Sequence, residues 1–219
     1  AYIYSAATSR MNYAMSENGY MPKWMQNLNQ RGVPAKAILL NFVIGMLFFL
    51  PFPGWQAMVS FLVSCFVLAY AIGPLSCAAL RKSMPDHPRP FKLPAYKTIC
   101  LAAFYICNLL VYWTSWTTVW RMLLTVSVGY LFLIAYRYYH KKQDDMQWQH
   151  SVWLFPYLLG TGIISYLGAF GGQNIISFGW DFIVIALFSF GVFVAALKPI
   201  ANAMPTSAEL IEEQEHESI

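Results

Sequence analysis

The chain has 219 residues, of which 58% are hydrophobic and 11% are charged, and its formal net charge is +4. Soluble domains carry charge on about a quarter of their residues. This composition therefore excludes an ordinary soluble protein and predicts one that lies in a lipid bilayer. The basic excess does not indicate nucleic-acid binding, because the Lys and Arg residues flank apolar stretches, where anionic lipid headgroups attract them.

Six apolar stretches are each near the ~20 residues that a helix needs to cross the hydrocarbon layer. They predict membrane spans at residues 37–52, 57–80, 99–116, 118–136, 152–170 and 178–197. The third and fourth spans are separated because one helix over 99–136 would extend ~57 Å, nearly twice the ~30 Å of hydrocarbon. The tryptophans near Arg121 mark the turn between them, since Trp prefers the membrane interface.

Residues 1–16 are expected to form a shorter helix, which stops before Gly19 and Pro22. About four turns are too few to span a bilayer at ~1.5 Å per residue. We therefore interpret this segment as the inner end of a truncated transmembrane helix. The transmembrane region is predicted to cover residues 1–198, and residues 199–219 are predicted to form an acidic, solvated tail.

The Lys and Arg residues lie almost entirely in alternate gaps between the predicted spans. Arg121 is the exception, while the gaps at residues 53–56 and 171–177 contain no basic residue. By the positive-inside rule, the basic gaps face the cytoplasm. The sequence therefore predicts a multi-pass membrane protein with a cytoplasmic C-terminus.

Two of the basic gaps carry recognisable motifs. Residues 9–22 read SRMNYAMSENGYMP, and residues 80–94 read LRKSMPDHPRPFKLP. The first resembles the segment that closes the eighth helix of amino acid permeases in the amino acid, polyamine and organocation transporter superfamily. The second resembles the loop between helices ten and eleven of these permeases. Because both occur at the correct separation, the chain is similar to this family over at least residues 9–94.

The resemblance implies an all-α, LeuT-like fold, in which two inverted five-helix repeats are followed by peripheral helices. This chain would be the C-terminal part, consisting of the end of helix eight and helices nine to fourteen. In such transporters the substrate binds near the midplane, at breaks in the first and sixth helices. The main substrate site is therefore expected in an N-terminal half that this chain does not contain.

The number of spans and the sequence SYLGAFGG at residues 165–172 are similar to bacterial aspartate:proton symporters. This resemblance implies proton-coupled symport of an amino acid such as aspartate across the cell (inner) membrane. The implied partners are the amino acid, protons and the lipid bilayer, without nucleic acid. No cofactor or metal is expected, since the cysteines lie in or beside apolar stretches without the spacing of metal ligands. These cysteines are Cys65, Cys77, Cys100 and Cys107.

Five residues are candidates for the substrate pathway. Tyr4 and Ser5 lie where the eighth helix of this family approaches the substrate, although ordinary helix packing is the alternative. Ser60, Ser64 and Tyr70 lie in the span that matches helix ten, which helps to form the outward gate. Ser60 and Ser64 share a helix face, and hydrogen bonding between helices is the alternative role for such serines.

Charged residues are expected to lie outside the membrane interior. Arg10 and Glu17 are two turns apart on the first helix, where they have either a structural role or a role in the inner gate. The acidic residues, Asp181 included, and the histidines lie in gaps, at interfaces or in the tail, so no proton relay crosses the bilayer here. Asn108, a polar residue within an apolar run, is expected to hold helices together.

The alternatives to a transporter are a membrane enzyme, a channel and a membrane scaffold. An enzyme is excluded because the spans contain no HExxH motif, no paired carboxylates and no histidine to act as a base. A channel would show a carbonyl filter or an Arg-rich voltage sensor, and neither is present in the sequence. A non-transporting membrane scaffold or a channel-like protein is the remaining alternative.

Overall fold

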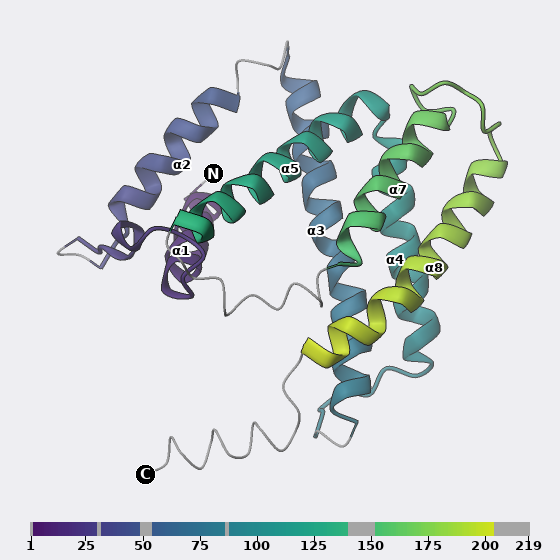
Figure 1. Cartoon of the computed structure of the whole chain (residues 1–219), viewed down its shortest axis with the longest axis horizontal. Helices are drawn as coiled ribbons and strands as arrows, with labels where there is room; N and C mark the ends of the chain where they lie inside the picture. Colours follow the sequence, from purple (N-terminus) through teal and green to yellow (C-terminus); the bar gives the residue numbers. More distant parts are fainter. Residues whose placement is uncertain (1, 30–31, 49–53, 86–87, 140–151, 204–219) are drawn as a thin grey trace. The chain divides into compact units, whose positions relative to one another are not determined.

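The computed structural model describes residues 2–29, 32–48, 54–85, 88–139 and 152–203. Every regular element within these ranges is a helix, which confirms the all-α fold class (Figure 1). The elements are α1 (Tyr2–Glu17), the short 3-10 helix η1 (Lys23–Gln26), α2 (Ala35–Phe48), α3 (Trp55–Ser83), α4 (Tyr96–Trp113), α5 (Trp116–Tyr139), α7 (Leu154–Leu167) and α8 (Trp180–Ala203). The predicted acidic tail beyond Ala203 lies outside the described residues.

Four of the described helices, α3, α4, α5 and α8, are long and apolar enough to cross a membrane. The apolar helices α2 and α7 are shorter, with 14 residues each, which corresponds to ~21 Å. They occupy parts of the predicted spans 37–52 and 152–170. Residues 49–53, beyond α2, are outside the described ranges. Helix α7 ends early because Gly168 adopts an extended conformation, with φ −77° and ψ 174°.

Tertiary contacts also accompany differences from the predicted boundaries at the turn between α4 and α5 and at the end of α8. The turn between α4 and α5 lies at Thr114 and Ser115, earlier than the predicted gap at residue 117. Ser115 has a φ of 80°, and the amide of Trp116 donates a hydrogen bond of 3.0 Å to the carbonyl of Phe170. Helix α8 continues to Ala203, past the predicted end of the span at residue 197, and its Ile200 packs against the core.

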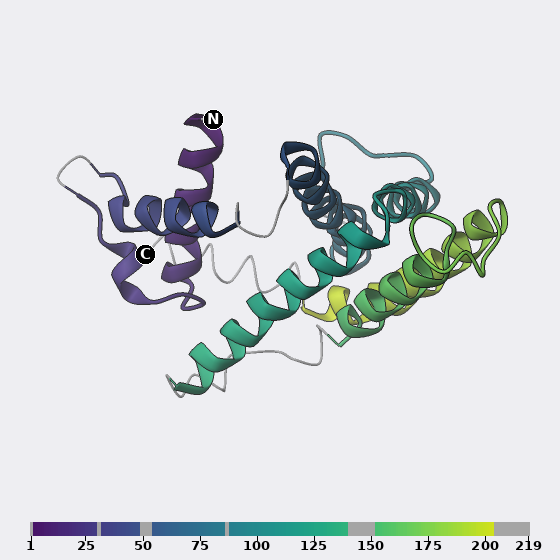
Figure 2. The same cartoon turned by 90° about the horizontal axis from the view of Figure 1, so that it is seen from above.

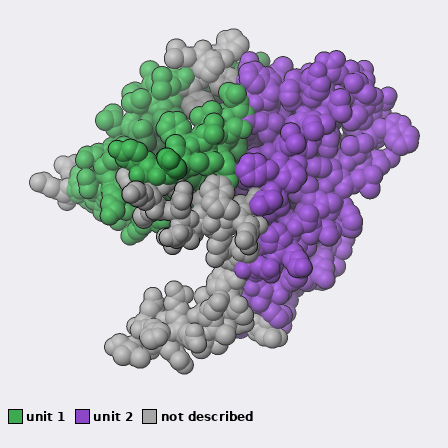
Figure 3. All heavy atoms as spheres, viewed as in Figure 1, with its two compact units in different colours: residues 1–59, 124–145 green, residues 60–123, 146–219 purple. Residues whose placement is uncertain are grey.

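The chain divides into two compact units, which Figure 3 shows in different colours. Unit 1 consists of residues 1–59 and 124–145 and contains α1, η1, α2 and most of α5. Unit 2 consists of residues 60–123 and 146–219 and contains most of α3 with α4, α7 and α8. Each unit has its own internal packing, so each is described by itself.

In unit 1, the segment after α1 closes onto the end of that helix. Gly19 has a φ of 77°, and its amide donates to the carbonyl of Ser16 at 3.1 Å, while the amide of Tyr20 donates to that of Met15 at 2.9 Å. This pair of bonds is the Schellman motif that glycine favours at a helix end. Ser16 is buried, and its hydroxyl donates to the carbonyl of Pro22 at 2.7 Å.

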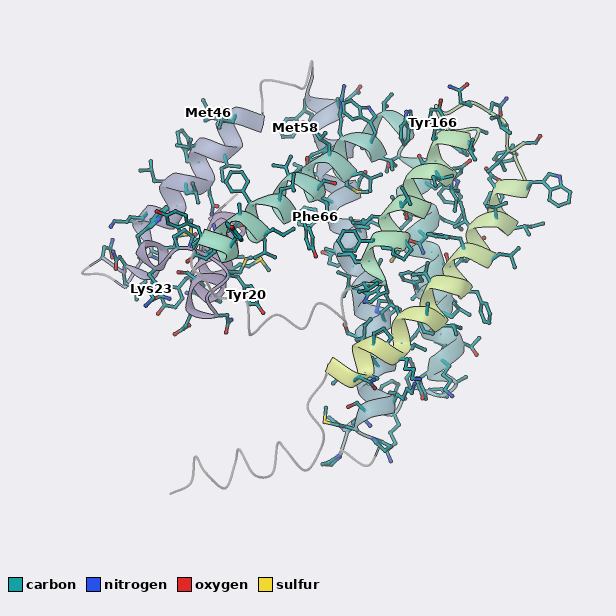
Figure 4. The ribbon with its side chains drawn as sticks, in the orientation of Figure 1. Tyr20, Lys23, Met46, Met58, Phe66 and Tyr166 are labelled. Atoms are coloured by element: carbon teal, nitrogen blue, oxygen red, sulfur yellow. The ribbon has the colours of Figure 1, made fainter. Side chains whose placement is uncertain are left out.

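Polar side chains also connect the helices of unit 1. The amide of Asn12 in α1 donates to the side-chain oxygen of Asn41 in α2 at 2.8 Å. The hydroxyl of Tyr136 in α5 donates to the carbonyl of Met21 at 3.1 Å. Figure 4 labels Tyr20 and Lys23 in the segment between α1 and α2 that receives this contact. The first permease-like motif therefore forms a turn held by hydrogen bonds.

In unit 2, α4, α7 and α8 pack side by side, as Figures 1 and 2 both show. Their shared core includes Leu75 of α3, Phe104 of α4, Tyr157 of α7, and Phe193 and Ala196 of α8. The ring centroids of Phe104 lie 5.6 Å from Tyr157 and 6.2 Å from Phe193. This cluster forms the apolar end of the bundle, near the start of α4 and the end of α8.

Candidate functional site

The candidates at the beginning of the chain all lie on α1. Tyr4 and Ser5 belong to its first turns, and the structure describes their backbone but not their side chains. Arg10 and Glu17 are both exposed. No ion pair between these two residues is recorded in the described part of the chain, so their pairing stays a prediction.

The candidates on α3 have different environments. Ser64 is buried, and its hydroxyl donates to the backbone carbonyl of Ser60 at 2.8 Å. The hydroxyl is therefore satisfied within its own helix. Ser60 is exposed, and Tyr70 is 68% exposed, with its ring stacked on Phe66 at 6.5 Å. Figure 4 labels Phe66 on α3. Of the α3 candidates, the structure joins only Ser60 and Ser64 by a described contact.

A buried carboxylate is the main polar feature that the sequence did not predict. Asp181, in the first turn of α8, is 1% exposed. One of its carboxylate oxygens accepts hydrogen bonds from the amides of Gly179 and Phe182, both at 2.9 Å. The other accepts the hydroxyl of Tyr112, in α4, at 3.1 Å. The location of Asp181 at a helix end matches the expectation, but its burial does not.

Tyr112 links this carboxylate to the loop that follows α7. Its oxygen accepts the amide of Ala169 at 3.0 Å while its hydroxyl hydrogen is donated to Asp181. A side chain on Gly168 would overlap the Tyr112 ring, which explains why glycine stands at that position. An aspartate just before an apolar run is a helix-start signal. That signal indicates an aspartate near the start of α8, where its carboxylate accepts the amides of Gly179 and Phe182, but no local pattern indicates Tyr112.

A second polar cluster lies further along the same three helices. Tyr157 of α7 donates its hydroxyl to the side-chain oxygen of Asn108 at 2.8 Å. Asn108 of α4 in turn donates its amide to the hydroxyl of Ser189 in α8 at 2.9 Å. All three residues are buried. Asn108 therefore holds helices together, as its position within an apolar run suggested.

The two clusters lie on the same faces of their helices. Asn108 and Tyr112 are one turn apart on α4, and Asp181 and Ser189 are eight residues apart on α8. Beyond Ser189, the described interior consists of the apolar core around Phe104 and Phe193. The polar groups therefore do not continue through the bundle. Their chemistry is that of mutual hydrogen bonding, which fixes the relative positions of α4, α7 and α8.

A shallow groove on unit 2 has an apolar lining. It lies between the start of α5 and α7, beside Trp116, Leu123, Leu159 and Tyr166. The rings of Trp116 and Tyr166 meet edge to face at 5.2 Å, and Figure 4 labels Tyr166 on α7. This groove offers no charged group for the carboxylate or ammonium of an amino acid. The described residues also contain no group of three or more His, Cys, Asp or Glu that could hold a metal.

Comparisons with known proteins identify the family. The amino acid permease family model matches residues 1–134. The chain is 34% identical to the Glutamate/serine transporter AimA of Bacillus subtilis over 202 residues, which are 89% of this chain and 37% of that protein. It is also 34% identical to the Aspartate-proton symporter of the same organism over 196 residues, which are 87% of this chain and 38% of that protein.

The chain therefore spans less than two fifths of the length of either relative. No solved structure gave a significant match. The family match confirms the resemblance that the two motifs predicted and the prediction that the chain is not an enzyme. The chain belongs to the amino acid permease family and is a multi-pass membrane protein.

Proposed function

We propose that this chain is the C-terminal part of a secondary active transporter that couples the uptake of an acidic amino acid, such as aspartate, to inward proton movement. The observation that carries the proposal is 34% identity, over most of the chain, to two amino acid transporters. One of these is named for glutamate and serine, and the other for aspartate and protons. An acidic amino acid is the substrate class common to both names.

The proposal places the main substrate site in the N-terminal half of the complete transporter. The polar groups buried in unit 2 support this placement, because Asp181, Tyr112 and Asn108 are bonded to one another's helices and loops rather than directed into an open cavity. Helices α1, α2 and α3 would then complete the second repeat of a LeuT-like fold, and α4, α5, α7 and α8 would be its peripheral helices, while substrate binds at broken helices near the midplane. In this proposal, α4, α7 and α8 support the transport core.

We place the protein in the cytoplasmic membrane of a bacterium, with the basic gaps and the C-terminus inside. Single cysteines introduced by Gly54→Cys and Gln173→Cys should react with a membrane-impermeant reagent added outside intact cells. A cysteine introduced by Asp86→Cys should react only after the membrane is opened. The four native cysteines must first be replaced by serine. The reverse pattern of labelling would invert the proposed orientation.

The transport proposal is tested with the complete protein, of which this chain is a part, reconstituted in lipid vesicles. Uptake of labelled aspartate is measured with and without an inward proton gradient. We expect uptake that rises with the gradient and is abolished by a protonophore. Uptake that ignores the gradient would refute proton coupling, and no uptake of any amino acid would refute the permease proposal.

Competition with unlabelled amino acids defines the substrate class in the same vesicles. Inhibition by glutamate without inhibition by serine indicates an acidic specificity. Inhibition by glutamate and serine together indicates the specificity for which the first relative is named. Inhibition by serine but by neither acidic amino acid would contradict an acidic substrate.

A further inference from the structure

One end of unit 2 carries four exposed lysines, each from a different part of the fold. Lys82 lies at the end of α3, Lys92 lies in the segment between α3 and α4, Lys97 lies in the first turn of α4, and Lys198 lies near the end of α8. Contacts among α3, α4 and α8 in the shared core bring these helix ends together. Figure 1 shows this end at the bottom of α3 and α4.

The arginines at the same end have a different role. Arg81 donates to the carbonyl of Leu93 at 2.9 Å, and its guanidinium lies 5.0 Å from the centre of the Tyr96 ring. Arg89 donates to the carbonyl of Met84 at 2.6 Å and to that of Leu80 at 3.3 Å, at the end of α3. Both arginines therefore hold the segment between α3 and α4 in place, and the lysines are not needed for this purpose.

An exposed aromatic residue lies within this basic surface. Phe91 is 70% exposed and stands between Pro90 and Lys92. An aromatic ring directed away from its own protein, beside lysines, is the pattern of segments that enter the boundary between headgroups and acyl chains. Residues 80–97 contain five basic residues and one acidic residue, Asp86, which lies outside the described ranges. The surface is therefore complementary to an anionic lipid leaflet.

We propose that Lys82, Lys92, Lys97, Lys198 and Phe91 form a binding surface for anionic phospholipids, with the lysines on the headgroups and the Phe91 ring between them. The inference rests on the membrane orientation given under the proposed function, which places this end at the inner leaflet. The proposal rests on the different environments of these residues. Arg81 and Arg89 donate hydrogen bonds to backbone carbonyls and hold the segment in place, whereas the lysines and Phe91 are exposed at the surface of the unit.

The test measures lipid binding directly, so its outcome does not depend on whether the complete protein transports aspartate. The purified complete protein in a neutral detergent is titrated with fluorescent phosphatidylglycerol or phosphatidylcholine. We expect the Kd for phosphatidylglycerol to be at least tenfold lower than the Kd for phosphatidylcholine. Each lysine near an anionic surface contributes about a fivefold change in affinity, so Lys92→Gln with Lys97→Gln should raise the Kd roughly 25-fold.

The control removes two exposed, uncharged side chains from the other end of unit 2, by Gln173→Ala with Ser177→Ala. This control should change the Kd less than threefold, and Lys92→Arg with Lys97→Arg should retain tight binding. Phe91→Ala should raise the Kd severalfold without altering its dependence on salt. Equal effects of this control and of Lys92→Gln with Lys97→Gln, or equal affinity for both lipids, would overturn the proposal. Displacement of the lipid by excess inorganic phosphate would also overturn it, because it would show a small-anion site.

Discussion

The two ends of the α4, α7 and α8 bundle are held together by different means. Towards one end, two separate hydrogen bonds connect α4 and α8, one between Tyr112 and Asp181 and one between Asn108 and Ser189. At the other, the rings around Phe104 and small residues of α3 and α8 fill the interior. Lipid is as apolar as these side chains, so burial alone gives helices little reason to associate in a membrane. The hydrogen bonds at the polar end determine which helix faces meet, and the side chains at the apolar end give close packing between those faces.

The largest effect is expected at the polar end. Asp181→Ala would remove the acceptor of three donors, namely the buried Tyr112 hydroxyl and the part-buried amides of Gly179 and Phe182. Hydrogen bonds to charged groups contribute more than neutral ones, and an orphaned buried donor loses its full solvation. We expect the free energy of unfolding in detergent to fall by about 3 kcal/mol. Asp181→Asn keeps one acceptor and should cost less.

Thermal unfolding of the complete protein, followed by the fluorescence of its tryptophans, measures this loss. If Asp181→Ala and Asp181→Asn lower the free energy of unfolding equally, the hydrogen bonds to the carboxylate are not the source of its contribution to stability. If neither variant has an effect, the contrast between the two ends of the bundle is wrong.

A smaller effect is expected at the apolar end. Phe104→Ala would remove a fully buried ring that contacts Tyr157 and Phe193. In soluble proteins this change costs about 3–5 kcal/mol, as the sum of a transfer term and a cavity term. The unfolded reference in lipid or detergent already holds the ring in an apolar medium, so mainly the cavity term remains. We therefore expect a loss of about 2 kcal/mol.

The same unfolding measurement applies to Phe104→Leu, which keeps most of the volume and should cost less than half as much as Phe104→Ala. A Phe104→Ala loss larger than that of Asp181→Ala would reverse the order of the two ends. It would mean that packing, rather than hydrogen bonding, dominates the bundle.

The bond between Asn108 and Ser189 is expected to contribute least among the buried contacts. Hydrogen bonds between transmembrane helices average about 0.6 kcal/mol in double-mutant cycles, because the unfolded chain in the membrane also finds partners. The cycle consists of Asn108→Ala, Ser189→Ala and the double variant. We expect a coupling energy near 0.6 kcal/mol in thermal unfolding. A coupling of zero would indicate that Asn108 acts through Tyr157 alone, which Tyr157→Phe would then reveal.

The same comparison shows what the sequence can predict. The six apolar stretches each overlap one helix of the structure, since uninterrupted apolar runs in lipid have few alternatives to helix. The end of α7 was not predicted, because it depends on Gly168 fitting against Tyr112, far away in the sequence. The turn at Ser115 was missed for a similar reason. A positive φ is uncommon for serine, and here the Trp116 amide bonds across to Phe170.

The candidate site shows the same division between local and distant information. Asn108 was singled out because one polar residue in an apolar run is visible in the sequence. Its partners Tyr157 and Ser189 were not, because they lie 49 and 81 residues away. The burial of Asp181 likewise depends on Tyr112. Hydrogen-bond partners between helices are set by helix packing, and the apolar pattern alone does not contain that information.

Outside the bundle interior, Tyr70 tests whether an exposed residue of α3 has a role in transport. Because it is 68% exposed, Tyr70→Ala should change the free energy of unfolding by less than about 0.5 kcal/mol. If Tyr70 lines the substrate pathway, the same variant should lower aspartate uptake severalfold in vesicles, whereas Leu62→Ala, at an exposed position two turns earlier on α3, should not. Tyr70→Phe separates the hydroxyl from the ring that stacks on Phe66. Because the expected change in stability is small, lowered uptake in Tyr70→Ala would not be explained by unfolding. Unchanged uptake would show that Tyr70 does not line the substrate pathway.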